Sequence, residues 1–149
     1  MTIKIGRVDV EAVRPLRAAV LRPEEDLAES VYPADDLADT IHLAAFDGEV
    51  VVGTATIFPE PHDGRPAWRL RGMAVAESRR GTGVGSALLA EVLRQVGEQG
   101  IDLLWCNART VALPFYTGHG FTIVGNEFRT ANGVPHYVAT CNLTERTPG

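Results

Sequence analysis

The sequence predicts one α/β domain over residues 1–149, and three observations support this. The length suits one domain, and the shares of hydrophobic (45%) and charged (22%) residues are ordinary for a globular protein with a proper core. Short segments rich in β-branched residues alternate with segments of helical periodicity. No repeat, low-complexity stretch or linker interrupts that order, so we expect one folded unit.

Seven segments are predicted to be strands, because each is short and combines apolar with β-branched residues. The residues Asp47-Gly48 between two of them are a strong hairpin signal. Residues 101–107 are almost continuously apolar, which is expected of a strand covered on both faces. In chain order the predicted strands span residues 3–8, 40–46, 50–58, 68–75, 101–107, 121–124 and 135–143.

The strongest predicted helix spans residues 83–99, and Gly100 follows it as a C-terminal stop. One face of this helix carries Val84, Leu88, Val92 and Val96. Apolar spacing also predicts helices at residues 10–21 and 110–117. The polar, acidic segment 23–39 is expected to be a loop with a short helix at residues 24–29.

The composition restricts the partners and the location. A net charge of -5 and a pI near 5.3 do not favour nucleic acid or an anionic membrane as the main partner. No stretch approaches the roughly 20 apolar residues of a membrane helix, and the N-terminus lacks a signal-peptide pattern, so we expect a soluble, cytoplasmic protein. Cys106 and Cys141 form no Cys-x-x-Cys pair and are expected to be buried thiols, and we predict no metal site.

A glycine-rich turn joins a predicted strand to the strongest helix. It reads Arg80-Gly81-Thr82-Gly83-Val84-Gly85-Ser86. The first N–H groups of a helix lack partners inside the helix, and the helix dipole favours negative charge there. Glycine lets a phosphate approach the backbone, and Arg79 or Arg80 adds a positive charge. The turn therefore predicts an anion-binding site.

Two well-known phosphate-binding loops do not fit this turn. A P-loop ends in Gly-Lys-Ser/Thr, whereas the helix here continues Gly85-Ser86-Ala87 without a lysine. A Rossmann loop has the spacing G-x-G-x-x-G and an acid at the end of the next strand. The spacing here is G-x-G-x-G, and the next strand ends at Asn107, which disfavours a dinucleotide.

The turn resembles the acetyl-coenzyme A motif of the GNAT superfamily of N-acetyltransferases, which reads Gln/Arg-x-x-Gly-x-Gly/Ala. Arg80, Gly83 and Gly85 occupy its three places. Residues 107–121 are similar to the family's next motif, with an Asn late in a strand, an aromatic-Tyr pair and then Gly-Phe. Residues 132–136 also resemble a turn seen in small bacterial members.

The resemblance implies a fold in which a mixed, mostly antiparallel twisted sheet of six or seven strands carries helices on both faces. The order of strands and helices fits this family along nearly the whole chain. In the family, the strands that begin here near Trp68 and Ile101 separate, and the pantetheine arm of the coenzyme fills the gap.

The resemblance also implies which residues would hold acetyl-coenzyme A (acetyl-CoA). The strand before the turn would offer backbone groups to the pantetheine arm and the thioester. The turn would bind the pyrophosphate, and Asn107 would hydrogen-bond the arm. The predicted coenzyme-binding residues are Met73, Ala74, Val75, Arg80, Gly81, Thr82, Gly83, Val84, Gly85, Ser86 and Asn107.

Acetyl transfer to an amine needs a neutral amine, a donor for the oxyanion and a proton for the leaving thiolate. Tyr116 occupies the family's general-acid position, so its hydroxyl is expected near the sulfur. The general base stays open between a water chain and a side chain. The side chains considered are His42, Glu77, His119 and His136, each of which also has an ordinary structural or solvated role as its alternative.

The charge of the acceptor also stays open. Arg69 and Arg71 alternate with Leu70, so they share one face of a strand and would either bind a substrate carboxylate or face solvent. In contrast, the segment from residue 24 to residue 39 holds seven acidic residues, among them Asp35 and Asp36, which would suit a cationic acceptor such as an aminoglycoside.

The sequence therefore predicts an N-acetyltransferase that moves an acetyl group from acetyl-CoA to a primary amine by direct attack in a ternary complex. The acceptor is a small molecule or a protein, and the assembly is a monomer or a homodimer. The alternative is a non-catalytic acyl-CoA-binding sensor, which has no need of an acid at Tyr116. A plain nucleotide-binding module is a third interpretation.

Overall fold

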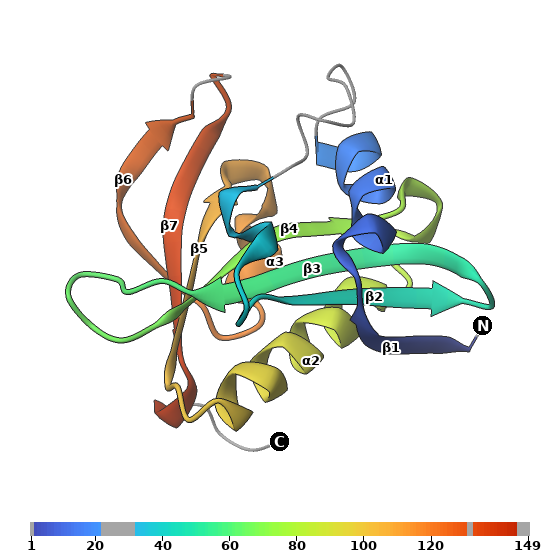
Figure 1. The fold of residues 1–149 in the computed structure, drawn as a ribbon. Coiled ribbons are helices and arrows are strands. Elements are labelled where there is room, and N and C mark those ends of the chain that lie inside the picture. The colour runs from blue at the N-terminus through green and yellow to red at the C-terminus, as the bar shows by residue number, and fades with distance from the viewer. Residues whose placement is uncertain (1, 22–31, 131–132, 146–149) are drawn as a thin grey trace.

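The computed structural model describes residues 2–21, 32–130 and 133–145. These residues form a seven-stranded sheet with the order β1-β2-β3-β4-β5-β7-β6 (Figure 1). The neighbouring strands are antiparallel except β4 and β5, which run parallel. The strands are β1 (Ile3–Val8), β2 (Ile41–Asp47), β3 (Val50–Pro59), β4 (Trp68–Val75), β5 (Leu103–Arg109), β6 (Thr122–Arg129) and β7 (Pro135–Asn142).

The helices are α1, α2 and α3, and four short 3₁₀ turns accompany them in the described part of the chain. The helices span Val10–Leu21, Val84–Glu98 and Leu113–Thr117, and the turns are η2 (Pro33–Asp36), η3 (Glu77–Arg79), η4 (Thr110–Ala112) and η5 (Leu143–Glu145). None of these helices is long and apolar enough to cross a membrane, as far as the described residues go.

The two long helices cover opposite faces of the sheet. On one face of β3, Gly53 lies under α2 so closely that an added Cβ would be 2.6 Å from Leu88 Cδ1. Thr56 points to the other face of β3, where it accepts a hydrogen bond from Arg17 of α1. The predicted fold class, a mixed and mostly antiparallel sheet with helices on both faces, is confirmed.

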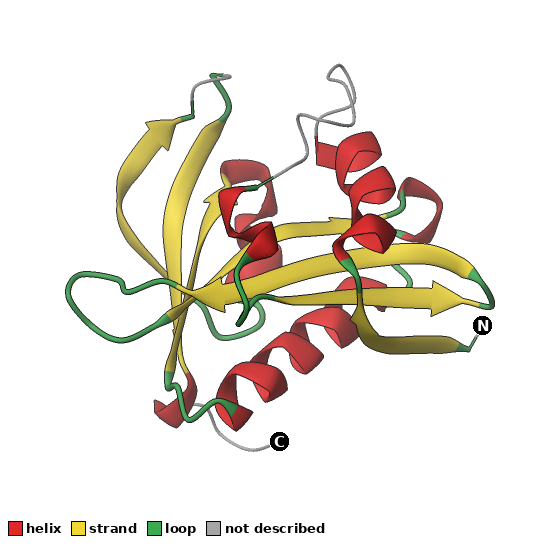
Figure 2. Ribbon diagram, viewed as in Figure 1, coloured by secondary structure: helices red, strands yellow, loops and turns green. Residues whose placement is uncertain are grey.

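The two central strands β4 and β5 share a very short ladder. Only Trp68 pairs with Leu104 and Arg69 with Trp105, and β4 runs on to Val75 without further pairing to β5. Figure 2 shows the result, because β1 to β4 and β5 to β7 run in clearly different directions. The predicted separation of these strands is therefore present, and it opens the middle of the sheet.

A bulge in β4 lies just where the two strands part. Thr54 pairs with Ala74 and Thr56 with Arg71, so β4 holds one residue more than β3 between these pairs. Gly72 occupies the bulge with a φ of 64°, and a Cβ there would lie 2.9 Å from Arg17 Nε. The position needs glycine for its backbone conformation and for the close approach of α1.

Two strands, β5 and β6, differ from the sequence prediction by more than one residue at a boundary. β5 begins and ends two residues later than predicted, because its antiparallel ladder with β7 continues to Arg109 opposite His136. β6 extends to Arg129 instead of ending at residue 124. Its register shifts between Val124 and Phe128, where Gly125 has a φ of 75°, and Phe128 and Arg129 then resume pairing with β7 at the edge of the sheet.

The predicted helix at residues 110–117 is divided into η4 and α3. The structure places η2 in the polar, acidic segment that was predicted to be a loop. The short helix predicted at residues 24–29 lies outside the described residues.

Replacing Gly72 by alanine tests the bulge. The positive φ costs an L-residue about 1–2 kcal/mol, and the clash with Arg17 adds to that cost, so Gly72→Ala should lower the free energy of unfolding measured in urea. Gly6→Ala in β1 is the matched control, because a Cβ there meets no atom within 4 Å. Equal stability of the two variants would contradict the proposed constraint.

Candidate functional site

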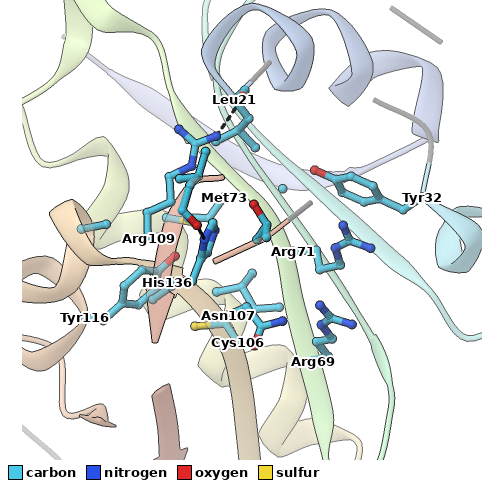
Figure 3. A pocket seen from close by; sticks show the side chains of 16 residues that line it. Leu21, Tyr32, Arg69, Arg71, Met73, Cys106, Asn107, Arg109, Tyr116 and His136 are labelled. Carbon is cyan, nitrogen blue, oxygen red and sulfur yellow. Dashed lines mark hydrogen bonds between the residues drawn. The ribbon is translucent and has the colours of Figure 1, made fainter. Parts of the chain in front are cut away.

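A pocket of about 220 Å³ lies where β4 and β5 separate. Figure 3 shows Tyr116 and His136 on one side of this pocket and Arg69 and Arg71 on the other. The rest of the lining comes mainly from β4 and β5, with Leu21 at the end of α1 and Thr130 and Val134 near the β6–β7 connection. The polar and charged lining residues are Tyr32, Arg69, Arg71, Asn107, Arg109, Tyr116, Thr130 and His136.

The pocket brings together residues that were predicted from distant parts of the chain. Arg69, Arg71, Met73, Asn107, Tyr116 and His136 all line it. Ala74 and Val75 lie farther along β4, where Val75 approaches the start of α2. A Cβ at Gly85 would be 3.5 Å from Val75 Cγ2 and 3.3 Å from Phe115 Cε1. The end of β4, the glycine turn and α3 therefore meet beside the pocket.

Tyr116 is held in a mostly apolar setting. Its side chain is 7% exposed, and its ring makes edge contacts with Phe115 and Phe121 at centroid distances of 5.2 Å. Burial raises the pKa of the Tyr116 phenol well above its ordinary value, and neighbouring Cys106 adds to the rise. The phenol therefore stays protonated near neutral pH, as a proton donor must.

Cys106 is another titratable group that lines the pocket. Burial raises the pKa of its thiol to about 12, while the positive charge of Arg69 acts in the opposite direction. The nucleophilic form of cysteine is the thiolate, so a thiol with this pKa is inert near neutral pH. The predicted burial of Cys106 and Cys141 is confirmed.

His136 in β7 lines the pocket, and its hydrogen bonding defines which ring nitrogen carries the proton. Its Nδ1 lies 2.8 Å from the carbonyl oxygen of Val134, and a carbonyl only accepts, so Nδ1 carries the proton. In the neutral ring, Nε2 is then the proton acceptor. The ring also stacks on Phe128 with an interplanar angle of 26°, which fixes its orientation.

The glycine turn gives α2 a start without a capping side chain. Gly81 and Gly83 have φ values of 77° and 92°, and a Cβ at either position meets no atom within 4 Å. Both glycines are needed for the backbone conformation, and their open surroundings leave room for a phosphate. With Arg80 beside them, the donors at this helix start match the chemistry of a phosphate.

Two further candidates lie near this turn and outside the pocket lining. His119 contacts Ser86 Oγ through Nε2 at 3.0 Å and the carbonyl oxygen of Phe115 through Nδ1 at 2.7 Å. Glu77 lies in η3 and is exposed. His119 is thus placed to orient the Ser86 hydroxyl, and neither His119 nor Glu77 lines the pocket.

Residues 11–121 match the model of the Acetyltransferase (GNAT) family. The match covers well over half of the chain. This chain belongs to the GNAT family. It is therefore a member of an acetyltransferase family, and the resemblance drawn from its glycine turn and its Asn107 segment is confirmed.

Relatives agree with this assignment. This GNAT protein is 28% identical over 129 residues to the uncharacterized N-acetyltransferase YitI of Bacillus subtilis (strain 168), covering 85% of this chain and 87% of YitI. It is 25% identical over 138 residues to the uncharacterized N-acetyltransferase YjcF of the same strain, covering 81% of this chain and 96% of YjcF.

Solved structures share the fold of this GNAT protein. An aminoglycoside 6'-N-acetyltransferase complexed with coenzyme A aligns with a TM-score of 0.77 at 19% identity, covering 97% of this chain and 99% of that one. FeeM, an N-acyl amino acid synthase from uncultured soil microbes, aligns with a TM-score of 0.80 at 16% identity, covering 97% and 92%. At such identities the likeness shows the fold alone.

The structure does not bring His42 to the pocket of this GNAT protein. Its Nε2–H donates to the carbonyl oxygen of Asp35 at 3.3 Å, and its Nδ1 accepts from Thr56 Oγ1 at 2.9 Å. Burial lowers the pKa of the His42 ring, which keeps it neutral near neutral pH. His42 is therefore a buried structural histidine, and its predicted place in the acceptor cleft is wrong.

Asp35 is likewise engaged inside the protein. Its carboxylate lies 3.0 Å from Nη1 of Arg17, and it accepts the backbone N–H of Tyr32 at 2.9 Å. Asp35 is 6% exposed and Arg17 is fully buried, so the expectation that Asp35 meets a cationic acceptor is wrong. Asp36 is exposed and does not line the pocket. Four other acidic residues of this segment lie outside the described residues, namely Glu24, Glu25, Asp26 and Glu29. The same holds for Asn132 of the predicted turn at residues 132–136.

Among the polar and charged lining residues, sequence reasoning missed three, Tyr32, Arg109 and Thr130. Arg109 follows Asn107 by two positions, so strand alternation puts both on one face, but the strand was predicted to end at Asn107. Arg109 Nη2 donates to the carbonyl oxygen of Leu21, the last residue of α1, at 2.6 Å. No sequence signal marks Tyr32, since its place depends on Arg17 and Arg71 packing over its ring.

Replacing Arg17 by methionine tests the buried ion pair. The variant leaves the Asp35 carboxylate buried without its closest cation, which should cost about 3–5 kcal/mol of unfolding free energy in urea denaturation. Arg94→Met is the control, because Arg94 pairs with Glu91 and Glu98 on the exposed face of α2 and its loss should change stability little. A similar loss in both variants would contradict the account.

Proposed function

We propose that this protein is an acetyl-CoA-dependent N-acetyltransferase that transfers acetyl to a primary amine. The observation that carries the proposal is the pocket between β4 and β5, which has an acid, Tyr116, and an acceptor nitrogen on His136 along one side. The glycine turn lies beside the same opening. The N-acetyltransferase relatives and the coenzyme A complex of a neighbour with this fold support the choice of reaction and co-substrate.

The residues present fit coenzyme A. Beyond Arg69, β4 lacks a ladder to β5, so backbone groups of Met73, Ala74 and Val75 are available to the amides of a pantetheine arm. Asn107 faces the pocket from the other strand. The pyrophosphate would lie on the N–H groups from Arg80 to Ser86, where the open glycines admit it.

In the proposed reaction, His136 acts as the general base. Its Nε2 takes a proton from the incoming ammonium, and Nδ1–H stays bonded to the Val134 carbonyl, which stabilises the imidazolium that forms. The neutral amine nitrogen then attacks the thioester carbon. The guanidinium groups of Arg69 and Arg71 favour the neutral amine as well, because like charges disfavour an ammonium.

Tyr116 acts as the general acid in the same step. As the C–N bond forms and the C–S bond breaks, the Tyr116 hydroxyl proton moves to the departing sulfur. The attacking nitrogen releases its second proton to solvent as the amide forms, and solvent later returns a proton to the phenol. The raised pKa of Tyr116 keeps the phenol protonated until the thiolate leaves. Because the Cys106 thiol is inert, we propose direct attack in a ternary complex without an acetylated cysteine.

Titration calorimetry and a thiol-release assay test this function together. Acetyl-CoA and coenzyme A should bind, whereas NAD and ATP should not, and thiol should appear when a suitable amine is added. Failure of both coenzyme A compounds to bind would end the proposal. Binding without thiol release over a broad amine panel would point to the acyl-CoA sensor instead.

Two variants test the acid and the base. Tyr116→Phe should lower kcat about 100-fold or more while the Kd of acetyl-CoA changes little. His136→Ala should lower kcat to a similar degree, and added imidazole should restore part of it. Tyr137→Phe and His62→Ala are the matched controls, since neither residue lines the pocket. An unchanged kcat in Tyr116→Phe would contradict the role of Tyr116 as the acid, and an unchanged kcat in His136→Ala would contradict the role of His136 as the base.

A further inference from the structure

One histidine that the proposed reaction does not use joins the glycine turn to the helix that carries Tyr116. His119 follows α3, and its half-buried ring packs against the ring of Phe115 with a centroid distance of 4.7 Å. Its Nε2 lies 3.0 Å from Ser86 Oγ in the first turn of α2, and its Nδ1 lies 2.7 Å from the carbonyl oxygen of Phe115. The ring therefore contacts a residue of the proposed pyrophosphate site.

These two contacts fix where the hydrogens of the pair lie. A carbonyl oxygen only accepts, so Nδ1 of His119 carries the proton and donates to Phe115. In the neutral ring Nε2 has no hydrogen, so it accepts the O–H of Ser86. A serine hydroxyl has a single hydrogen, and beside the neutral ring that hydrogen points to His119. The Ser86 oxygen can then accept a hydrogen bond but cannot donate one to a ligand.

This direction of the Ser86 hydroxyl is unsuitable for a phosphate. Ser86 is the third residue of α2 and is exposed, and side chains on a helix lean toward its N-terminus. Its oxygen therefore lies toward the glycine turn, where Gly81 and Gly83 leave open space. An ionised phosphate oxygen also accepts and does not donate. With the neutral ring, two acceptors would face each other, which opposes the ligand that the turn fits.

A second proton on His119 removes this conflict. Nε2–H then donates to Ser86 Oγ, Nδ1–H stays on the Phe115 carbonyl, and the Ser86 hydrogen is released to donate to a phosphate oxygen. The ring also gains a positive charge close to an anion, which favours the protonated form. Imidazole is the side chain whose charge ordinarily changes between pH 5 and 8, so solvent can supply this proton.

The elements that hold the ring, α3 and the start of α2, carry little charge of their own. The titratable residue of α3 is Tyr116, whose phenol stays neutral, and the first turn of α2 has no acidic or basic residue. The charged residues farther along α2, in the glycine turn and in η3 are Glu91, Arg94, Glu98, Arg80, Glu77 and Arg79. Arg79 is paired with Asp47 at 2.6 Å. A pyrophosphate on the turn would therefore be the main new charge beside His119 and Ser86.

We propose that His119 is a positioning residue for the co-substrate: binding of the pyrophosphate takes up a proton on its ring and turns the Ser86 hydroxyl toward the phosphate. This inference rests on the proposed function. Because the bound state favours the protonated ring, the affinity for the coenzyme is highest at low pH and falls as the pH rises and the ring loses that proton. The hydrogen bond from the hydroxyl to an ionised phosphate makes this difference about 10- to 100-fold.

Titration calorimetry on the wild-type protein tests the proton uptake directly. Dephospho-coenzyme A is the main ligand, because it keeps the pyrophosphate and lacks the 3′-phosphate, a monoester whose own proton titrates at about pH 6. Titrations between pH 5.5 and 8.5, each in two buffers with different enthalpies of ionisation, give the number of protons taken up. We expect about half a proton or more at the pH of maximum uptake, and an affinity about 10- to 100-fold higher at pH 5.5 than at pH 8.5.

Two variants identify the source of the proton linkage. His119→Gln cannot take up a proton, so its uptake should be lower than that of the wild type by about half a proton, and the pH dependence of its affinity should shrink about 10-fold or more. Ser86→Ala should weaken binding about 10-fold at pH 5.5 and change it less than about 3-fold at pH 8.5, where the hydroxyl points away from the ligand.

His62→Gln is the matched control, since His62 stacks on Trp105 and lies outside the pocket lining. It should keep the proton uptake of the wild type. The thermal midpoint of each variant verifies its folding. If either His119→Gln or Ser86→Ala fails to fold, the other decides the question, because each alone should remove the uptake.

The outcomes separate this inference from the function on which it rests. Coenzyme binding with equal proton uptake by the wild type and His119→Gln overturns the inference alone. Loss of uptake in His119→Gln with full uptake in Ser86→Ala also overturns it, because the ring then acts on the phosphate without Ser86. If dephospho-coenzyme A does not bind, the same comparison is made with coenzyme A, whose 3′-phosphate contributes equally in every variant. Absence of binding by both compounds overturns both proposals.

Discussion

The parting of β4 and β5 is the constraint on which the candidate site depends. The two strands share only two residue pairs, and each keeps a long ladder with its other neighbour, β3 or β7. Backbone N–H and C=O groups therefore lack ladder partners in the middle of a sheet, where such groups are normally satisfied. A ligand with amides of its own can take the place of the missing pairing, and the pocket lies at this point.

The side of the sheet under α1 is arranged to maintain that opening. The Arg17–Asp35 pair, joined by Thr56 and His42, is a buried polar network in which each hydrogen bond supports the next. Gly72 allows Arg17 to approach β4 at the bulge. Removing one member leaves a charge or a donor unsatisfied in a buried site, so this network holds one wall of the pocket in a single arrangement.

Much of the fold and part of the site could be predicted from the sequence, because local signals carry them. β1, α1 and β4 match their predicted bounds, since each has clear periodicity and a clear boundary. The side chains of Tyr116 and Asn107 were found through motif spacing. In contrast, His42 is buried because it bonds to Thr56, which lies 14 residues farther along the chain and also contacts α1. Tyr32 is held by Arg17 and Arg71, which come from two other elements. Packing between distant elements leaves no local pattern to read.

A crystal structure with coenzyme A tests the central claim most directly. The account predicts that the pantetheine arm lies between β4 and β5, with the pyrophosphate on the turn from Arg80 to Ser86 and the sulfur within hydrogen-bonding reach of the Tyr116 hydroxyl. The side of the pocket lined by Arg69 and Arg71 should stay open to the acceptor. Coenzyme A bound elsewhere, or β4 and β5 paired along their full length around an empty gap, would contradict it.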